Sequence, residues 1–88
     1  MTNFAIVTPA KNEALDQRLK EIYEEQDVLF VDDNLRIVSS DKEVTAESLY
    51  IKLEHSKDKY GRVIVFSVSS YYGFHAKSVW EWLTSRSS

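Results

Sequence analysis

The chain has 88 residues and a mass of 10.2 kDa, which is enough for one domain with a small hydrophobic core. Hydrophobic residues make up 43% and charged residues 28%, with two glycines and one proline, so the composition excludes a disordered or collagen-like chain. The absence of cysteine excludes a disulfide framework, a thiolate zinc site and a cysteine nucleophile. We therefore expect a single domain over residues 1–88, stabilised by packing or by self-association.

The formal net charge of −3 is distributed unevenly along the chain. Residues 1–44 contain five Lys and Arg against ten Asp and Glu, whereas residues 45–88 contain six against four. A protein that binds nucleic acid through its phosphates normally carries a dense basic face, and the only local concentration of basic residues here lies between Lys52 and Arg62. We expect that segment to be a solvated helix end and turn, and nucleic-acid binding to be weak or absent. No stretch approaches the roughly 20 apolar residues of a membrane span, so we also expect a cytoplasmic protein without a membrane anchor.

The predicted elements begin with an apolar run at residues 3–8, which indicates a strand that ends before Pro9. An amphipathic helix follows, with Asn12 as its N-cap. Its apolar face is formed by Leu15, Leu19, Ile22 and Tyr23. Residues 28–31 and 35–38 then predict two strands of a hairpin, because the intervening Asp32-Asp33-Asn34 is typical of a tight turn.

A polar link from Ser39 to Val44 precedes a second predicted helix, which Thr45 caps and which ends near Ser56. Its apolar face is formed by Ala46, Leu49, Tyr50 and Leu53. Residues 62–68 are the most strand-prone segment, rich in β-branched side chains and nearly continuous in apolarity, so we expect a well-buried strand. Helical spacing returns in the last part of the chain, at Ala76, Val79, Trp80 and Leu83.

The predicted order is strand, helix, strand, strand, helix, strand, followed by one extra helix. This order is typical of an α+β fold, the ferredoxin-like βαββαβ sandwich, here with one additional C-terminal helix. The first two helices would cover one face of the sheet. The other face would expose apolar side chains unless the C-terminal helix, a second copy of the chain, or both covered it.

Three parts of the chain carry a resemblance to a known group. They are the opening strand Phe4-Ala5-Ile6-Val7, the segment Leu35-Arg36-Ile37-Val38 with the later Thr45-Ala46-Glu47-Ser48-Leu49-Tyr50, and Arg62-Val63-Ile64-Val65-Phe66 leading into Ser78-Val79-Trp80-Glu81-Trp82-Leu83. Over residues 4–83 the chain resembles small bacterial ferredoxin-like proteins related to the CRISPR adaptation subunit that bridges integrase dimers, and to virulence-associated protein D.

The resemblance implies a homodimer, a nucleic-acid context and, in some members, metal-dependent endonuclease activity centred on an acidic residue at the end of the first strand. Here that strand ends Val7-Thr8-Pro9-Ala10, with no Asp or Glu before Glu13. No catalytic residue can therefore be carried over. Our hypothesis is a dimeric protein that acts through protein association, without catalysis and without a cofactor. The alternative is a metal-dependent endoribonuclease or endodeoxyribonuclease with carboxylates that the sequence does not reveal.

The remaining polar motifs do not assign a catalytic, cofactor or metal site. Asp32 and Asp33 are adjacent carboxylates that would suit a divalent cation only if a third ligand converged on them, and Asp is an ordinary turn residue. His55 and His75 have no recognisable orienting partner. A further acidic group, Glu24, Glu25 and Asp27, is most simply a solvated helix end, with a basic protein partner as the alternative.

Aromatic residues near the C-terminus provide the interface candidates. Trp80 shares the apolar stripe of the last helix, which predicts a core position, whereas Trp82 lies about 200° away on a helical wheel. Both side chains cannot face the same core. We therefore predict Tyr71, Tyr72 and Trp82 as interface residues.

Overall fold

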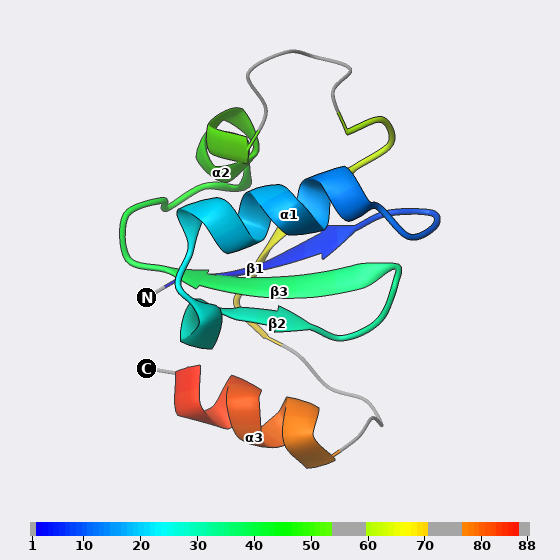
Figure 1. Cartoon of the computed structure of the whole chain (residues 1–88). Helices are drawn as coiled ribbons and strands as arrows, with labels where there is room; N and C mark the ends of the chain where they lie inside the picture. Colours follow the sequence, from blue (N-terminus) through cyan, green and yellow to red (C-terminus); the bar gives the residue numbers. More distant parts are fainter. Residues whose placement is uncertain (1, 54–59, 71–76, 87–88) are drawn as a thin grey trace.

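The computed structural model describes residues 2–53, 60–70 and 77–86. Its elements are β1 (Thr2–Val7), α1 (Glu13–Ile22), the 3-10 turn η1 (Glu25–Asp27), β2 (Val28–Phe30), β3 (Leu35–Ser40), α2 (Ala46–Leu53), β4 (Ile64–Val68) and α3 (Lys77–Arg86). Helices α1 and α2 lie on one side of the sheet and α3 lies on the other (Figure 1). The predicted mixed α+β class is confirmed. Within the described residues, no helix is both long enough and apolar enough to span a bilayer.

The four strands form one sheet in the order β2-β3-β1-β4, and each neighbouring pair is antiparallel. The central strands are therefore β3 and β1, while β2 and β4 are the two edges. Strand β1 pairs with β3 over its full length, with Phe4 opposite Val38, and with β4 from Asn3 to Val7. A strand alternates its side chains between two faces, so this register decides which residues meet the helices.

The main core lies between the sheet and helices α1 and α2. Phe4 and Ile6 point from β1 into it, and the buried leucines of the two helices pack from above. Those leucines are Leu15, Leu19, Leu49 and Leu53. Their spacing of four residues places each pair on one face of its helix, as the sequence predicts.

The helix starts are also as predicted. The side-chain oxygen of Asn12 accepts a hydrogen bond from the backbone N–H of Leu15 at 3.1 Å, and the side-chain nitrogen of Asn12 donates to the carbonyl of Tyr60 at 2.7 Å. Thr45 caps α2 through a bond of 3.1 Å from the N–H of Ser48. These caps satisfy donors that the first helical turn leaves without partners. The predicted end of the second helix, near Ser56, lies outside the described residues.

Two predictions about strands are wrong. Strand β3 does not end at Val38 but continues through Ser39 and Ser40, which are buried because they pair with Asn3 and Thr2 of the central strand β1. Strand β4 begins at Ile64 and is not well buried, because it lies at the edge of the sheet and alternates between a covered and an open face. Apolarity alone does not distinguish such an edge strand from a central one.

Candidate functional site

An apolar patch lies on the sheet face that α1 and α2 do not cover. In the antiparallel ladder Val7 of β1 is opposite Ile64 of β4, and Ala5 is opposite Phe66, so these side chains share one face. Ile64 is 59% exposed, Phe66 is 52% exposed and Val7 is 37% exposed. We call Val7, Ile64 and Phe66 the β4 patch.

The same sheet face is covered at its other end. Asn3, Ile37 and Ser39 point to this face and are buried. Helix α3 lies on this side of the sheet (Figure 1), and its Leu83 is only 6% exposed. Of the covers that the sequence left open, the C-terminal helix α3 therefore lies over part of this face, and the β4 patch is the part left open.

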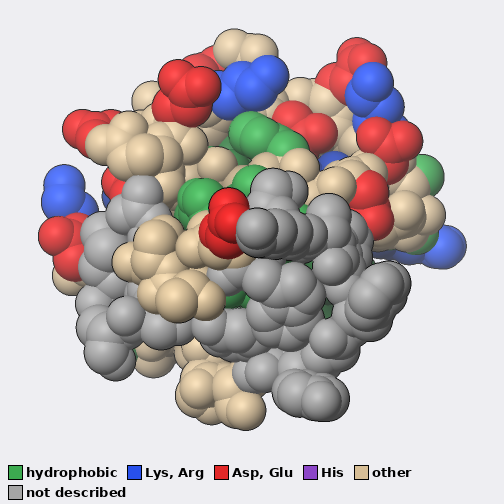
Figure 2. Space-filling view, turned by 90° about the horizontal axis from the view of Figure 1, so that it is seen from below, with side chains coloured by type: hydrophobic (Ala, Val, Ile, Leu, Met, Phe, Trp, Pro, Cys, Tyr) green, Lys and Arg blue, Asp and Glu red, His purple; other side chains and the backbone are tan. Residues whose placement is uncertain are grey.

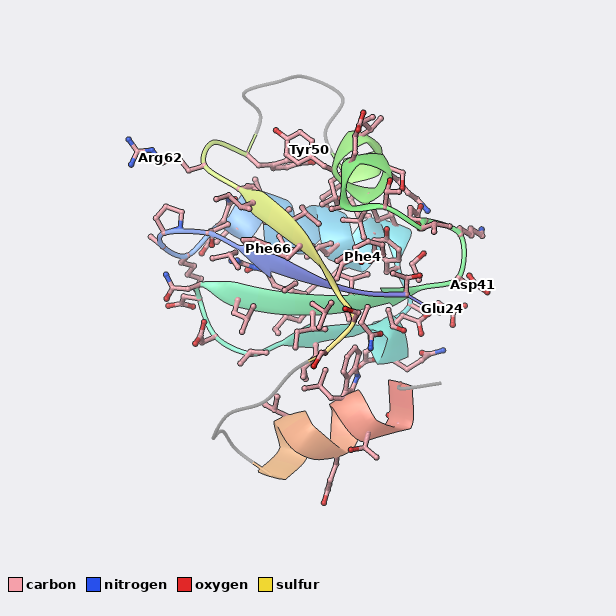
Figure 3. All side chains as sticks on the ribbon, turned by 180° about the vertical axis from the view of Figure 1, so that it is seen from behind. Phe4, Glu24, Asp41, Tyr50, Arg62 and Phe66 are labelled. Carbon is pink, nitrogen blue, oxygen red and sulfur yellow. The ribbon has the colours of Figure 1, made fainter. Side chains whose placement is uncertain are left out.

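Among the residues that the structure describes, no strand pairs with the outer edge of β4, so an open backbone edge lies beside this patch. Figure 3 views the molecule from the side on which β4 is nearest and labels Phe66 on this strand. The strand reads Ile64-Val65-Phe66-Ser67-Val68, without a charge or a proline. Soluble proteins usually protect edge strands with charges, prolines, bulges or very short length, because an open edge pairs readily with another strand. By contrast, the other edge strand, β2, has three residues.

A buried arginine, Arg36, fixes the start of β3. The side chain of Arg36 is fully buried. Its Nε donates to Oδ1 of Asp16 at 2.5 Å, Nη1 donates to the hydroxyl of Thr8 at 2.6 Å, and Nη2 donates to the carbonyl of Asp33 at 2.7 Å. The guanidinium thereby links α1, the loop after β1 and the β2–β3 turn. Its partners are those that a buried charge requires, so the role of Arg36 is structural.

The two adjacent turn carboxylates are not brought together with further ligands. A carboxylate oxygen of Asp32 accepts a hydrogen bond from the backbone N–H of Asn34 at 2.8 Å, which is the geometry of an Asx turn. Asp33 contributes its backbone carbonyl to Arg36. Among the residues that the structure describes, no three His, Cys, Asp or Glu side chains are grouped as metal ligands.

A second buried polar cluster surrounds Glu43, in the loop between β3 and α2. Nζ of Lys52 lies 2.8 Å from Oε1 of Glu43, and the hydroxyl of Ser40 donates to Oε2. Lys52 also lies over the ring of Tyr23, with Nζ 5.1 Å from the ring centroid. The sequence suggests that Lys52 belongs to a solvated helix end, whereas in the structure Lys52 pairs with Glu43 and lies over Tyr23. Arg62 is exposed, and the lysines between them lie outside the described residues.

These contacts shift two pKa values. Burial alone would raise the pKa of Glu43, but hydrogen bonds from Lys52 and Ser40 and the positive charge of Lys52 outweigh it and lower the pKa. Burial, followed by the nearby charge of Glu43, raises the pKa of the Tyr23 hydroxyl above its ordinary value. Tyr23 is thus neutral and Glu43 ionised at neutral pH.

The lowered pKa of Glu43 predicts an acid-dependent loss of stability. We expect Glu43→Gln to be less stable than the unmodified protein at pH 7, because it loses the ion pair with Lys52. The ion pair stabilises the fold fully above the ordinary glutamate pKa of about 4.3. This stabilisation is lost as the pH falls through the lower pKa that Glu43 has in the folded protein. Urea denaturation at several pH values measures the difference in free energy of unfolding between the unmodified protein and Glu43→Gln. This difference should become smaller below about pH 4.

The matched control for this measurement is Glu47→Gln, which removes one exposed carboxylate from α2. Its effect on the free energy of unfolding should be small at every pH. A difference between Glu43→Gln and the unmodified protein that stays constant, or widens, on acidification would contradict the assigned role of Glu43.

Of the predicted interface residues, only Trp82 lies within the described side chains. It is partly buried and lines a groove between α3 and the β2 edge. Tyr71 and Tyr72, like His55 and His75, lie outside the described residues, and so does the side chain of Trp80. The exposure of Phe66 and Ile64 is not predicted from the sequence, because only the strand order reveals that β4 is an edge.

Comparison of the chain with protein-family models, curated proteins and solved structures finds no match. The candidate site therefore depends on the geometry described above.

Proposed function

We propose that the protein is a ferredoxin-like association protein that forms a homodimer through β4. Two features support the fold assignment. Read from β4, the strand order is β4-β1-β3-β2, and α1 and α2 each connect two strands of the sheet from the same side (Figure 1). A split βαβ arrangement of this kind is characteristic of the ferredoxin-like motif.

The observation that carries the dimer proposal is the open β4 edge with its adjacent patch. Ile64 and Phe66 remain more than half exposed although they lie on a sheet face that is elsewhere covered. The edge has no charged side chain, so two copies of this acidic protein can approach there without direct repulsion between like charges. A second copy would also satisfy the outward backbone groups of β4.

The sequence of β4 is compatible with its own antiparallel partner. If the dimer axis passes beside Phe66, then Phe66 lies opposite Phe66 of the partner subunit. Ile64 then lies opposite Val68 of the partner subunit. Residues 64, 66 and 68 all point to the open face, because every second residue of a strand lies on the same side of the sheet. Aromatic and β-branched pairs across strands stabilise a sheet by about 0.2–1 kcal/mol each. A closed dimer with one self-complementary surface is the commonest form of homo-oligomer.

The nuclease alternative receives no support from the described residues. The position directly after β1 is Thr8, whose hydroxyl donates to the carbonyl of Ala10 at 2.7 Å and accepts from Arg36. That hydroxyl therefore has a structural role in the loop.

Disulfide cross-linking tests the proposed dimer and its register together. The chain has no cysteine, so Phe66→Cys introduces a single thiol. In the proposed register the two copies of residue 66 lie directly opposite each other, at the Cα separation of about 4.5–5.5 Å that a disulfide requires. Under mild oxidation we expect most of this variant to become a covalent dimer, detected by non-reducing electrophoresis.

Ile51→Cys is the matched control, since Ile51 is an apolar residue on α2 that is even more exposed than Phe66. It should form few cross-links under the same conditions. Equal cross-linking of the two variants, or preferential cross-linking through residue 51, would show that β4 is not the dimer interface.

A further inference from the structure

A groove lies at the other edge of the sheet, between α3 and the segment from the end of α1 to β2. Its volume is about 860 Å3, within the range of about 300–1,000 Å3 that is common for ligand pockets. Its lining includes Lys20, Glu24, Glu25, Leu29, Phe30 and Trp82. Figure 2 views the molecule from the side on which α3 lies in Figure 1, and it shows patches of hydrophobic side chains with acidic side chains among them.

The floor of the groove is apolar and partly aromatic. Leu29 of β2 is opposite Ile37 and points to the sheet face on which α3 lies, where Trp82 of α3 also lines the groove. Phe30 is opposite Arg36 and lines the groove from the α1 side of the β2 edge. Nζ of Lys20 lies 5.5 Å from the centroid of the Phe30 ring, so the cation of Lys20 is placed against an aromatic face. The apolar surface of Leu29 and Trp82 accepts an apolar side chain, and Trp is one of the residue types enriched at the energetic centre of protein interfaces.

One wall of the groove is acidic. Glu24 and Glu25 line it and are exposed, and Figure 3 shows Glu24 projecting near the start of β2. Within the described part of the chain, neither carboxylate forms an ion pair with Lys or Arg. Glu24 instead accepts a hydrogen bond from the side chain of Gln26 at 2.5 Å. The charge of this wall therefore favours a cationic ligand and disfavours phosphate.

We propose that this groove binds a basic peptide segment of a partner protein. An apolar side chain of the peptide lies between Trp82 and β2, and a neighbouring Lys or Arg lies at Glu24 and Glu25. The lining carries two carboxylates, Glu24 and Glu25, against one cation, Lys20, so charge complementarity favours a basic occupant, and the apolar floor distinguishes it from a purely cationic ligand. The groove borders β2, whereas the proposed dimer uses β4 at the opposite edge of the sheet, so this proposal does not depend on the dimer.

The binding of a labelled peptide tests the proposal. The probe is fluorescein-labelled Lys-Phe-Lys-Leu-Lys, and the comparison probe is Glu-Phe-Glu-Leu-Glu with the same label. Fluorescence anisotropy with the full chain should show saturable binding of the basic peptide that weakens as salt is added. The acidic peptide should bind at least tenfold more weakly, because its carboxylates would face Glu24 and Glu25.

Two variants locate the binding site. Glu24→Gln/Glu25→Gln should lower the affinity for the basic peptide about three- to tenfold, which lies within the range for two exposed ion pairs. The control Glu13→Gln/Glu47→Gln removes the same charge from exposed positions on α1 and α2, and it should change the affinity less than about twofold. Trp82→Ala should lower the affinity at least tenfold, as expected for an interface anchor.

Several results would overturn the proposal. They are the absence of saturable binding, binding of the acidic peptide as tight as that of the basic one, and an equal loss of affinity in the two double variants. Because Glu24 and Glu25 are exposed, their double variant retains the fold and remains informative if Trp82→Ala does not fold. Phe66→Lys, which is designed to disrupt the proposed dimer, should bind the basic peptide as the unmodified protein does. Loss of peptide binding in that variant would contradict the claim that the groove is separate from the β4 surface.

Discussion

Replacing Arg36 with methionine is expected to lower the free energy of unfolding by about 3 kcal/mol, the low end of the range for removing one partner of a buried ion pair. The side chain of Arg36 is fully buried and donates to three partners from three different segments. Methionine fills a similar space, so the loss is mainly electrostatic. The side chain of Asp16 is 22% exposed, so water can replace part of the lost interaction, which is why the low end applies.

Urea denaturation measures this effect directly. A domain of this size has an m-value near 1 kcal/mol per molar urea, so a loss of about 3 kcal/mol should lower the midpoint by about 3 M. Arg62→Met is the matched control, because Arg62 is exposed in the segment that leads to β4, and it should change the stability by less than about 0.5 kcal/mol. If Arg36→Met and Arg62→Met have the same midpoint, the Arg36 network does not stabilise the fold.

Phe66→Lys is expected to convert the proposed dimer to a monomer without unfolding the chain. In the proposed register two lysines would face each other across the dimer axis, and the interface would lose its central aromatic pair. In the monomer Phe66 is 52% exposed, so a charged side chain at this position can remain in water. We expect the dimer dissociation constant to rise at least a hundredfold, which is about 2.7 kcal/mol.

Sedimentation velocity over a range of protein concentrations provides the dissociation constant. Ile51→Lys is the control, since Ile51 is an exposed apolar residue on α2 rather than on β4, and it should leave the dimer intact. A Phe66→Lys variant that sediments as the unmodified dimer would rule out β4 as the interface.

The local structure follows closely from the sequence because short-range patterns determine it. Leu15 and Leu19 define the inner face of α1, and Leu49 and Leu53 define that of α2. Asn12 and Thr45 mark the helix starts through their side-chain caps. The Asp32-Asp33-Asn34 turn likewise separates β2 from β3, as its composition predicts.

Burial is less predictable, because it depends on the neighbours that the strand order supplies. Ser39 and Ser40 are polar and suggest a link, yet both are buried beside the central strand β1. Ile64 and Phe66 are apolar and suggest a core, yet both are exposed at an edge. No pattern within either segment distinguishes these outcomes.

The polar contacts that fix the loops join segments far apart in the sequence. They cannot be predicted from the sequence, because they too depend on which segments the fold brings together. Arg36 is 20 residues from Asp16 and 28 residues from Thr8 in sequence. One signal does exist: Arg36 precedes Val38 by two positions, so in a strand both must face the same side of the sheet. A charge on the core side requires a buried partner, and that requirement indicates a network without naming its members.

The most direct test of the proposed function is the mass of the unmodified protein in solution. We expect size-exclusion chromatography with light scattering, at micromolar protein concentration, to give twice the chain mass of 10.2 kDa. The dimer should dissociate on dilution and should be absent in Phe66→Lys. A mass of one chain at every concentration up to the millimolar range would contradict the homodimer and would leave the β4 patch without its proposed partner.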